Sequence, residues 1–297
     1  MKSGDFTYRL LSSVLLALLL STSSQAHEAL SQLEKAHDME LQHGLEKILE
    51  KHRLSSAVDN KKLALFIADL SDLENPRLAH VNGNQMMYAA SLPKLAILVA
   101  AFVKVDRQQL ELDESLWKDM NRMIRYSDNA AASRVLERVG KEDLLSILQE
   151  PEFMLYDREH GGGLWVGKAY SKDLAYRRDP LANLSHGATA IQAARVYYML
   201  LSGKLLGPEL SNKMLEILSR PGINHKLVKG LREKYPDATI YRKSGSWRNY
   251  HSDSAMIEVD NHHYLIVGLV EHPDGSQWLT NLAVPILDLL KKPKTTD

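Results

Sequence analysis

The sequence predicts an α/β fold in which an antiparallel sheet is flanked by helices, as an α/β/α sandwich, and carries an inserted all-helical lobe. Strand patterns lie near both ends of the chain, helical patterns fill its middle, and amphipathic helical patterns lie at both termini. Folding the two ends into one sheet leaves the middle as a second lobe. We expect an α/β lobe of about residues 27–88 plus 236–297, a helical lobe of about residues 89–235, and a cleft between them.

The first residues differ from the rest of the chain. Lys2 and Arg9 precede an apolar run that ends at Leu20, and small residues up to Ala26 offer a cleavage site. A membrane anchor is the alternative, but the apolar run is shorter than the roughly 20 residues that cross a bilayer. We therefore predict a signal peptide over residues 1–26, a periplasmic or secreted mature chain, and no membrane span after cleavage.

The composition excludes several classes of function. Lys+Arg and Asp+Glu both number 37, so the chain has no excess positive charge for nucleic acid or an anionic membrane. The absence of cysteine excludes thiol catalysis and a cysteine zinc site. The 12 histidines show no H-E-x-x-H spacing and are expected at the surface or in turns. We expect a monomer with no metal and no other cofactor.

The first part of the mature chain has one helical pattern, two strand patterns and a second helix. The second helix tolerates Pro93 only because that residue falls in its first turn. Gly44 is a possible break in the first helix. The expected elements are a helix over residues 28–52, strands over 63–68 and 77–81, and a helix over 91–103.

The rest of the chain is helical in its middle and returns to strands near its end. Glycines at positions 140 and 203 close two of the helices. The expected helices cover residues 130–139, 144–149, 190–201, 208–218, 224–233 and 279–290, and the expected strands cover 239–242, 255–259 and 264–270.

Three short polar motifs occur in an informative order. They are Ser91-Leu92-Pro93-Lys94, Ser127-Asp128-Asn129 and Lys243-Ser244-Gly245. Each is weak alone, and the first pattern recurs from Ser115 to Lys118, where an exposed polar cluster is the simpler interpretation. The first motif opens an apolar helix, the second precedes a helix start, and the third ends a strand. All three can face one cleft.

The first motif provides a nucleophile and a base. Residues three apart share one face of a helix, so the amine of Lys94 can reach the hydroxyl of Ser91. A serine hydroxyl reacts only when a neighbouring group takes its proton, and burial or nearby cations lower the pKa of a lysine enough for it to do so. The helix N-terminus also favours developing negative charge.

The other two motifs provide proton relay and substrate binding. The Ser127 hydroxyl can pass a proton to a leaving nitrogen, and the Asn129 amide can orient an amide-bearing substrate. Lys243 can hold Ser127 and a substrate carboxylate by its charge. The remaining assignments are a carboxylate contact for Ser244, an open strand edge at Gly245, and an oxyanion hole formed by the N–H groups of Ser246 and Ser91.

These motifs resemble those of the class A β-lactamases and their penicillin-binding relatives, which carry S-x-x-K, S-D-N and K-T-G elements in this order. The resemblance spans the mature chain and implies an α/β/α sandwich plus a helical domain. It also implies a β-lactam or a peptidoglycan stem peptide as partner. By matched motif, the acylated nucleophile is Ser91, its base is Lys94, the second-lobe pair is Ser127 and Asn129, and the strand side is Lys243, Ser244 and Ser246.

The resemblance fails at the step that hydrolyses the acyl-enzyme. Class A enzymes use a loop glutamate in a pattern like E-x-x-L-N, and this pattern is missing. The nearby carboxylates are Asp157, Glu159, Asp173 and Asp179, of which Glu159 is the best candidate for the deacylation acid or base, with a solvated loop acid as the alternative. Acylation is therefore expected to be intact. A slow-deacylating penicillin-binding protein or D,D-peptidase, and a non-catalytic peptidoglycan-binding protein, remain alternatives to a lactamase.

Two further signals are weaker. Gly162 to Ala169 nearly matches a phosphate-binding loop, but Ala169 cannot hold Mg²⁺ and no strand precedes the loop, so a glycine-rich loop beside the cleft is the better interpretation. Trp247 lies three residues after Ser244 and can form the floor of a substrate groove, whereas Arg248 is expected to be an ordinary solvated arginine.

Overall fold

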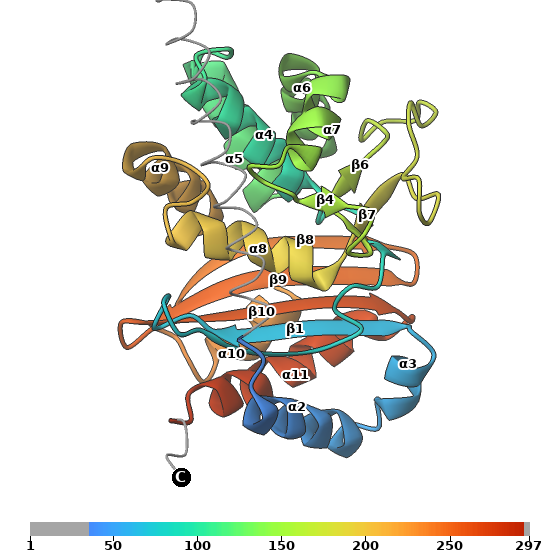
Figure 1. Ribbon diagram of the computed structural model, residues 1–297, viewed down its shortest axis with the longest axis vertical. Coiled ribbons are helices and arrows are strands. Elements are labelled where there is room, and N and C mark those ends of the chain that lie inside the picture. Colours follow the sequence, from blue (N-terminus) through green and yellow to red (C-terminus); the bar gives the residue numbers. More distant parts are fainter. Residues whose placement is uncertain (1–35, 294–297) are drawn as a thin grey trace, which may run out of the picture.

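The computed structural model describes residues 36–293, and the predicted signal peptide lies outside them. Its centre is a five-stranded antiparallel sheet in the order β2-β1-β10-β9-β8. Strands from the two ends of the described chain lie side by side in this sheet, as predicted (Figure 1). Their bounds are Leu63–Asp69 (β1), Arg77–Val81 (β2), Thr239–Trp247 (β8), Tyr250–Val259 (β9) and His262–Glu271 (β10).

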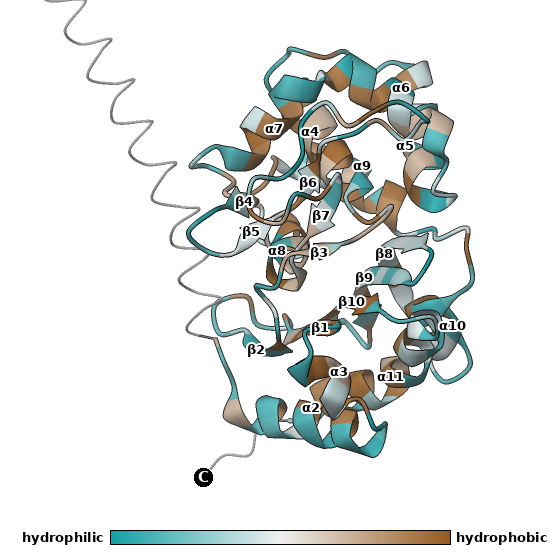
Figure 2. Cartoon of the chain, turned by 90° about the vertical axis from the view of Figure 1, so that its right-hand side faces the viewer, coloured by the Kyte–Doolittle hydropathy of each residue, from teal (hydrophilic) through white to brown (hydrophobic). Residues whose placement is uncertain are grey.

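Both faces of the sheet are covered by helices. In β1, Phe66 faces the core shared with the helical lobe, whereas Leu65 and Ile67 face the opposite core, because successive side chains of a strand point to opposite faces. Helix α8 covers the first face, and α2, α10 and α11 cover the second (Figures 1 and 2). These helices span Ala190–Leu201 (α8), Met39–Lys51 (α2), Lys226–Arg232 (α10) and Gly275–Leu290 (α11), and the short α3 spans Ser55–Asp59.

The second lobe is built around one buried helix. Helix α4 (Lys94–Asp106) is buried at every position from Lys94 to Val103, as expected for a helix that is apolar on all sides. It packs against several other helices of the lobe, on the α8 side of the sheet (Figure 2). The other helices of this lobe are Glu114–Arg125 (α5), Asn129–Val139 (α6), Lys141–Gln149 (α7) and Pro208–Leu218 (α9).

The second lobe also contains short strands, so the prediction that it is all-helical is wrong. Strands β3, β7 and β6 form a three-stranded sheet, and β4 pairs with β5. Two- and three-residue strands carry too little periodicity to be recognised in the sequence. Their bounds are Met87–Tyr88 (β3), Tyr156–Asp157 (β4), Gly162–Gly163 (β5), Trp165–Val166 (β6) and His186–Ala188 (β7).

The helix predicted over residues 28–52 is confirmed over α2, which begins only at Met39, after the capping residue Asp38, and passes unbroken through Gly44. Residues 28–35 of the predicted range lie outside the described residues. A Cβ at this position would lie 2.5 Å from Cδ1 of Leu289, so Gly44 permits close packing of α2 on α11 and does not break the helix. Helix α10 falls within the range predicted for the helical lobe but packs against α11 on the other face of the sheet. The lobe boundary is therefore better placed before α10.

Two boundaries near the predicted site also differ from expectation. Regular α-helix begins at Lys94, so Ser91 lies in the turn before α4 and not in the helix itself. Strand β8 continues to Trp247, beyond the predicted end at residue 242, since its polar residues break the hydrophobic alternation that predicts strands. The third motif therefore lies inside a strand.

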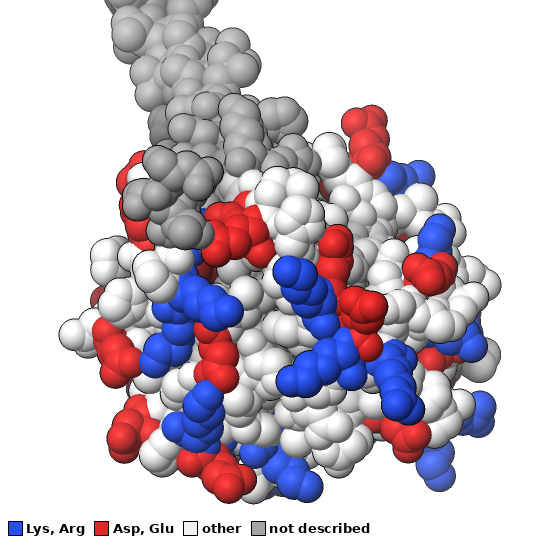
Figure 3. Space-filling model, turned by 90° about the horizontal axis from the view of Figure 1, so that it is seen from below, with Lys and Arg blue, Asp and Glu red and all other residues white. Residues whose placement is uncertain are grey.

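The surface charges are mixed. On the face shown in Figure 3, Lys and Arg side chains lie between Asp and Glu side chains and form no single-sign patch. Over residues 36–293, no helix is both long and apolar enough to cross a bilayer. In the same range, no group of three or more His, Cys, Asp or Glu side chains is placed to hold a metal ion.

Candidate active site

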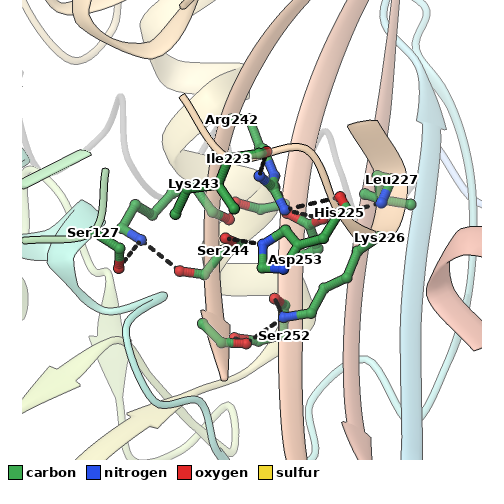
Figure 4. Close-up of polar contacts among 12 residues, drawn as sticks. Ser127, Ile223, His225, Lys226, Leu227, Arg242, Lys243, Ser244, Ser252 and Asp253 are labelled. Atoms are coloured by element: carbon green, nitrogen blue, oxygen red, sulfur yellow. Dashed lines mark hydrogen bonds and ion pairs between the residues drawn. The ribbon is translucent and has the colours of Figure 1, made fainter. Parts of the chain in front are cut away.

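The three predicted motifs meet between the sheet edge and the second lobe. Ser91 lies in the turn between β3 and α4, Ser127 lies between α5 and α6, and Lys243 lies in β8. Nζ of Lys243 donates a hydrogen bond of 3.0 Å to Oγ of Ser127, and Nζ of Lys94 lies 3.4 Å from the same oxygen. Figure 4 shows Lys243 reaching from β8 toward Ser127. Both amines therefore converge on one hydroxyl.

The turn that carries Ser91 is held from two sides. Ala90, directly before it, has a φ of 52°, in the left-handed region that costs energy for a residue with a side chain. The carbonyl of Ala89 accepts a hydrogen bond of 2.7 Å from Oγ of Ser252 in β9, and the carbonyl of Ala90 accepts one of 3.2 Å from the Tyr170 hydroxyl. Ser91 is half-buried and forms no side-chain hydrogen bond among the described residues. Its hydroxyl is thus available to a substrate.

Lys94 is a completely buried amine. Nζ donates to the carbonyl of Ser127 at 2.6 Å and to Oδ1 of Asn129 at 2.7 Å, and it lies 4.4 Å from the centre of the Tyr170 ring. Burial lowers the pKa of Lys94 to about 7, against the smaller opposing effect of the Asp128 charge. A substantial fraction of this amine is therefore neutral at neutral pH. Within the described residues its Nζ forms no hydrogen bond with Ser91.

The second motif is shaped by a helix cap. Asp128 caps α6 by accepting a hydrogen bond of 2.9 Å from the N–H of Ala131, and it forms an ion pair of 2.6 Å with Arg122. The Ala131 hydrogen bond and then the Arg122 interaction lower the pKa of Asp128. Ser127 has a φ of 58°, another left-handed conformation. The cap and this conformation place Ser127 and Asn129 around Lys94.

Neighbouring side chains of the third motif point to opposite faces of β8. Lys243 lies on the face toward the second lobe, and Ser244 lies on the opposite face. Lys243 is 1% exposed, and burial, followed by the charges of Lys94 and Arg242, lowers its pKa well below the usual value. Its amine also contacts the carbonyl of Ser244. Two amines with depressed pKa values therefore flank Ser127.

A buried ion pair supports β8 from behind. Arg242 and Asp253 in β9 form two hydrogen bonds of 2.7 and 2.8 Å, and the two residues are 4% and 0% exposed (Figure 4). Arg242 also donates to the carbonyl of His225, whose Nε2 lies 3.1 Å from Oγ of Ser244. Burial and then the charge of Arg242 lower the pKa of His225 to about 4, so this ring is neutral. Ser244 is thus fixed by a network that faces away from Lys243.

A second buried lysine holds the end of the strand. Nζ of Lys226 donates to the carbonyl of Gly245, to Oγ of Ser246 at 2.8 Å and to the carbonyl of Ser252 at 3.0 Å. Lys226 is 0% exposed, and burial lowers its pKa to about 8. Its three acceptors come from β8 and β9, so it fixes the strand end next to Ser91.

Gly245 is required by close contact with the turn that carries Ser91. A Cβ there would lie 2.3 Å from the carbonyl oxygen of Ala89 and 2.5 Å from the backbone nitrogen of Ser91. Both partners are backbone atoms, so a side chain would push β8 away from the turn. Ser246, the next residue, is exposed.

A cavity of about 640 Å³ opens beside these residues. Its walls are mainly aromatic and polar, and none of its lining residues is acidic. Asn129 and Tyr170 connect it to Lys94, and Trp247 forms part of its wall. The lining residues are Tyr88, Asn129, Lys168, Ala169, Tyr170, Ser171, Lys172, Leu184, Ser185, His186, Trp247 and Tyr250.

The acidic residues near this loop lie elsewhere. Glu159 is exposed between β4 and β5, where its N–H donates to Asp157. The carboxylate of Asp179 is buried and accepts from the Tyr156 hydroxyl and from three backbone N–H groups, so it holds the following loop together. Asp173 accepts from the hydroxyl of Ser171. None of these four predicted candidates lines the cavity.

Several residues of the site were not predicted. The expectation that histidines lie at the surface or in turns is wrong for His186, which is 5% exposed and lies 4.4 Å from Tyr170 by ring centroids. Tyr170, His225 and Lys226 also had no recognisable signal. Each occurs alone in a loop or at a helix start, and only the folded chain brings it to the motifs.

The overall architecture matches solved structures of one fold. The structure titled "Structure of PBP-A" has a TM-score of 0.60, with 21% identity over 79% of this chain and 94% of that chain. A β-lactamase from Chitinophaga pinensis has a TM-score of 0.62, with 16% identity over 80% and 97%. One from Sphaerobacter thermophilus has a TM-score of 0.64, with 16% identity over 82% and 98%. The chain therefore has the β-lactamase-like, transpeptidase-like fold.

The sequence itself defines the family. The model described as "Beta-lactamase enzyme family" matches residues 45–121 and 115–288, which together cover most of the chain. The chain therefore belongs to the beta-lactamase enzyme family. A comparison with curated proteins gave no match.

Proposed function

We propose that this protein is an exported active-site-serine hydrolase that forms an acyl-enzyme at Ser91 with β-lactams or with amides like D-alanyl-D-alanine. The observation that carries the proposal is the convergence of the Lys94 and Lys243 amines on the Ser127 hydroxyl, beside the Ser91 turn. A surface cluster of polar residues would not bury two amines completely, because burial of an unneutralised amine is costly.

Acylation begins with proton removal from Ser91. Neutral Lys94 takes this proton, and Oγ of Ser91 attacks the carbonyl carbon of the substrate. The N–H groups of Ser91 and Ser246 stabilise the oxyanion of the tetrahedral intermediate. Ser127 then delivers a proton to the leaving nitrogen and is reprotonated through the neighbouring amines, so that the C–N bond breaks and the acyl group remains on Ser91.

Substrate binding uses the groups on either side of the reacting bond. Asn129 orients the amide of the acyl part, and Lys243 holds the carboxylate of the leaving part. The Ser244 hydroxyl, which lies toward His225 on the other face of β8, adds to this contact only when it turns away from that partner. Gly245 leaves the edge of β8 open so that the substrate lies along it. The partner is a small-molecule β-lactam or a peptidoglycan stem peptide. In support, a mutant of PBP-A, at 21% identity, was solved as an acyl-enzyme complex with penicillin G.

The surroundings of the site favour a second candidate function, that of a penicillin-binding protein or D,D-peptidase that hydrolyses its acyl-enzyme slowly. No acidic residue lines the cavity, and Tyr170 lies directly over Lys94. Hydrolysis of the acyl-enzyme needs a water activated by a base. Glu159 remains our candidate for that role, and its exposed position outside the cavity supports a slow step.

Intact-mass spectrometry after incubation with penicillin G tests the proposal. We expect an adduct of one penicillin on the wild-type chain and none on Ser91→Ala. Ser115→Ala, in the second S-x-x-K match, is the matched control and should keep the adduct. Decay of the adduct over hours would favour a penicillin-binding protein, and decay within seconds would favour a lactamase. A folded wild-type protein with no adduct would support a non-catalytic, peptidoglycan-binding role.

A further inference from the structure

The cavity beside the candidate active site carries positive charge with no acidic residue to balance it. Lys168 and Lys172 both line it. Neither lysine forms an ion pair or a side-chain hydrogen bond with any of the described residues. The acidic residue next to Lys172 in the sequence, Asp173, accepts from Ser171 and does not line the cavity.

The backbone at Lys168 is held in place. Nε2 of His186 donates to the carbonyl of Lys168 at 3.0 Å, and the N–H of Gly167 donates to the carbonyl of Ser185 at 2.8 Å. Burial lowers the pKa of His186 to about 4, so this ring is neutral and adds no charge of its own. The positive charge of the cavity therefore comes from its two lysines, of which Lys168 is carried by a hydrogen-bonded segment of the wall.

Another part of the lining is aromatic. Tyr88 and Tyr250 meet edge to face with ring centroids 5.1 Å apart, and Trp247 beside them is 55% exposed. An exposed tryptophan that lines a cavity offers a flat apolar surface to a ligand. A volume of about 640 Å³ is in the range of small-molecule sites. The cavity thus combines apolar walls with two cations.

The position of the cavity decides which part of a substrate enters it. Asn129 and Tyr170 line it, whereas Lys243 and Ser244 do not. The latter two are assigned to the carboxylate of the leaving part, so the cavity lies on the acyl side of the reacting carbonyl. A group that occupies it would therefore remain attached to Ser91 after acylation.

We propose that this cavity binds the acyl substituent of the substrate and selects substituents that carry a carboxylate. The inference rests on the proposed acylation of Ser91. The carboxylate pairs with Lys168 and Lys172, and the apolar part of the substituent packs on Tyr88, Trp247 and Tyr250. Partly exposed ion pairs contribute modestly, so the effect is a preference and not an absolute requirement.

Two penicillins that differ by one carboxylate test this inference. Carbenicillin is benzylpenicillin with an added carboxylate on the acyl substituent. We expect the wild-type protein to have a larger second-order acylation rate constant with carbenicillin. In Lys168→Met/Lys172→Met, the ratio of the carbenicillin to the benzylpenicillin constant should fall by about 5-fold or more, as expected from two partly exposed ion pairs. High salt should lower the wild-type ratio in the same direction.

The control is Lys118→Met, which removes an exposed lysine of α5 outside the cavity and should leave the ratio unchanged. If both penicillins acylate Ser91 but the double variant keeps the wild-type ratio, or if the wild-type protein prefers benzylpenicillin, the inference is overturned while the proposed function stands. If neither penicillin forms an adduct, the proposed function fails and this inference fails with it.

Discussion

The sheet wall and the loop wall of the candidate site differ in how deeply their charged side chains are buried. On the sheet side, Arg242, Lys243, Lys226 and Asp253 are all at most 4% exposed, and each is held by several hydrogen bonds. On the loop side, Lys168 is half-buried and Lys172 is exposed. Buried charges are tolerated only with fixed partners, whereas exposed ones can change partners. The sheet wall is therefore suited to chemistry that needs fixed geometry, and the loop wall to selection among substrates.

The largest expected effect comes from breaking the buried pair of the sheet wall. Asp253→Asn keeps the shape of the side chain but leaves the guanidinium of Arg242 buried without a countercharge. We expect a loss of about 3–5 kcal/mol in the free energy of unfolding, measured by urea denaturation. The matched control is Asp143→Asn, whose partner is Lys104 and whose side chain is 59% exposed, so that a loss of at most about 1 kcal/mol is expected. Equal losses in the two variants would show that the buried Arg242–Asp253 pair contributes no more to stability than an exposed ion pair.

The next effect concerns Lys94, which lies between the two walls. Because its pKa is lowered to about 7, the amine is mostly protonated below that pH and cannot accept the Ser91 proton. The rate of acylation by penicillin G should therefore fall about tenfold per pH unit below 7 and level off above it. Adduct formation followed by mass spectrometry from pH 5 to 9 gives this profile. A flat profile would exclude neutral Lys94 as the base.

The smallest effect tests the loop wall at Tyr170. Tyr170→Phe removes one hydrogen bond to the Ala90 carbonyl and should cost about 1 kcal/mol of unfolding free energy. The ring above Lys94 remains, so the midpoint of the pH profile should stay in place. Tyr170→Leu removes the ring as well, and loss of its attraction for the ammonium should lower the midpoint by about half a pH unit or more. A shifted midpoint in the Phe variant would mean that the hydroxyl, and not the ring, acts on Lys94.

Much of this architecture was accessible from the sequence because it depends on local patterns. The short apolar runs of β1 and β10 predicted the sheet, and the largely apolar stretch after Ser91 predicted the central helix. The three polar motifs predicted which segments meet, because their residue types and their order along the chain suit one shared site, although the third lies inside β8 and not at a strand end. Their assigned chemical roles remain predictions.

The unpredicted part depends on contacts between distant segments. Lys226 lies in a short helix whose sequence predicts only an exposed basic residue, and its burial follows from the meeting of α10 with β8 and β9. Tyr170 and His186 lie in segments with no period, and their stacking depends on how the loop folds back on β7. Such contacts have high sequence separation and no local signature.

The carbonyl groups of Ala89 and Ala90, just before Ser91, are hydrogen-bonded to the two lobes. The Ala89 carbonyl accepts a hydrogen bond from Ser252 of the sheet and the Ala90 carbonyl accepts one from Tyr170 of the loop, so the residues before Ser91 are held from both lobes. If Ser91 is acylated as proposed, loss of either hydrogen bond is expected to slow acylation by every substrate alike. Substitutions intended to change substrate preference alone should therefore spare Tyr170. They should be made at neighbouring cavity residues that form neither of these two hydrogen bonds.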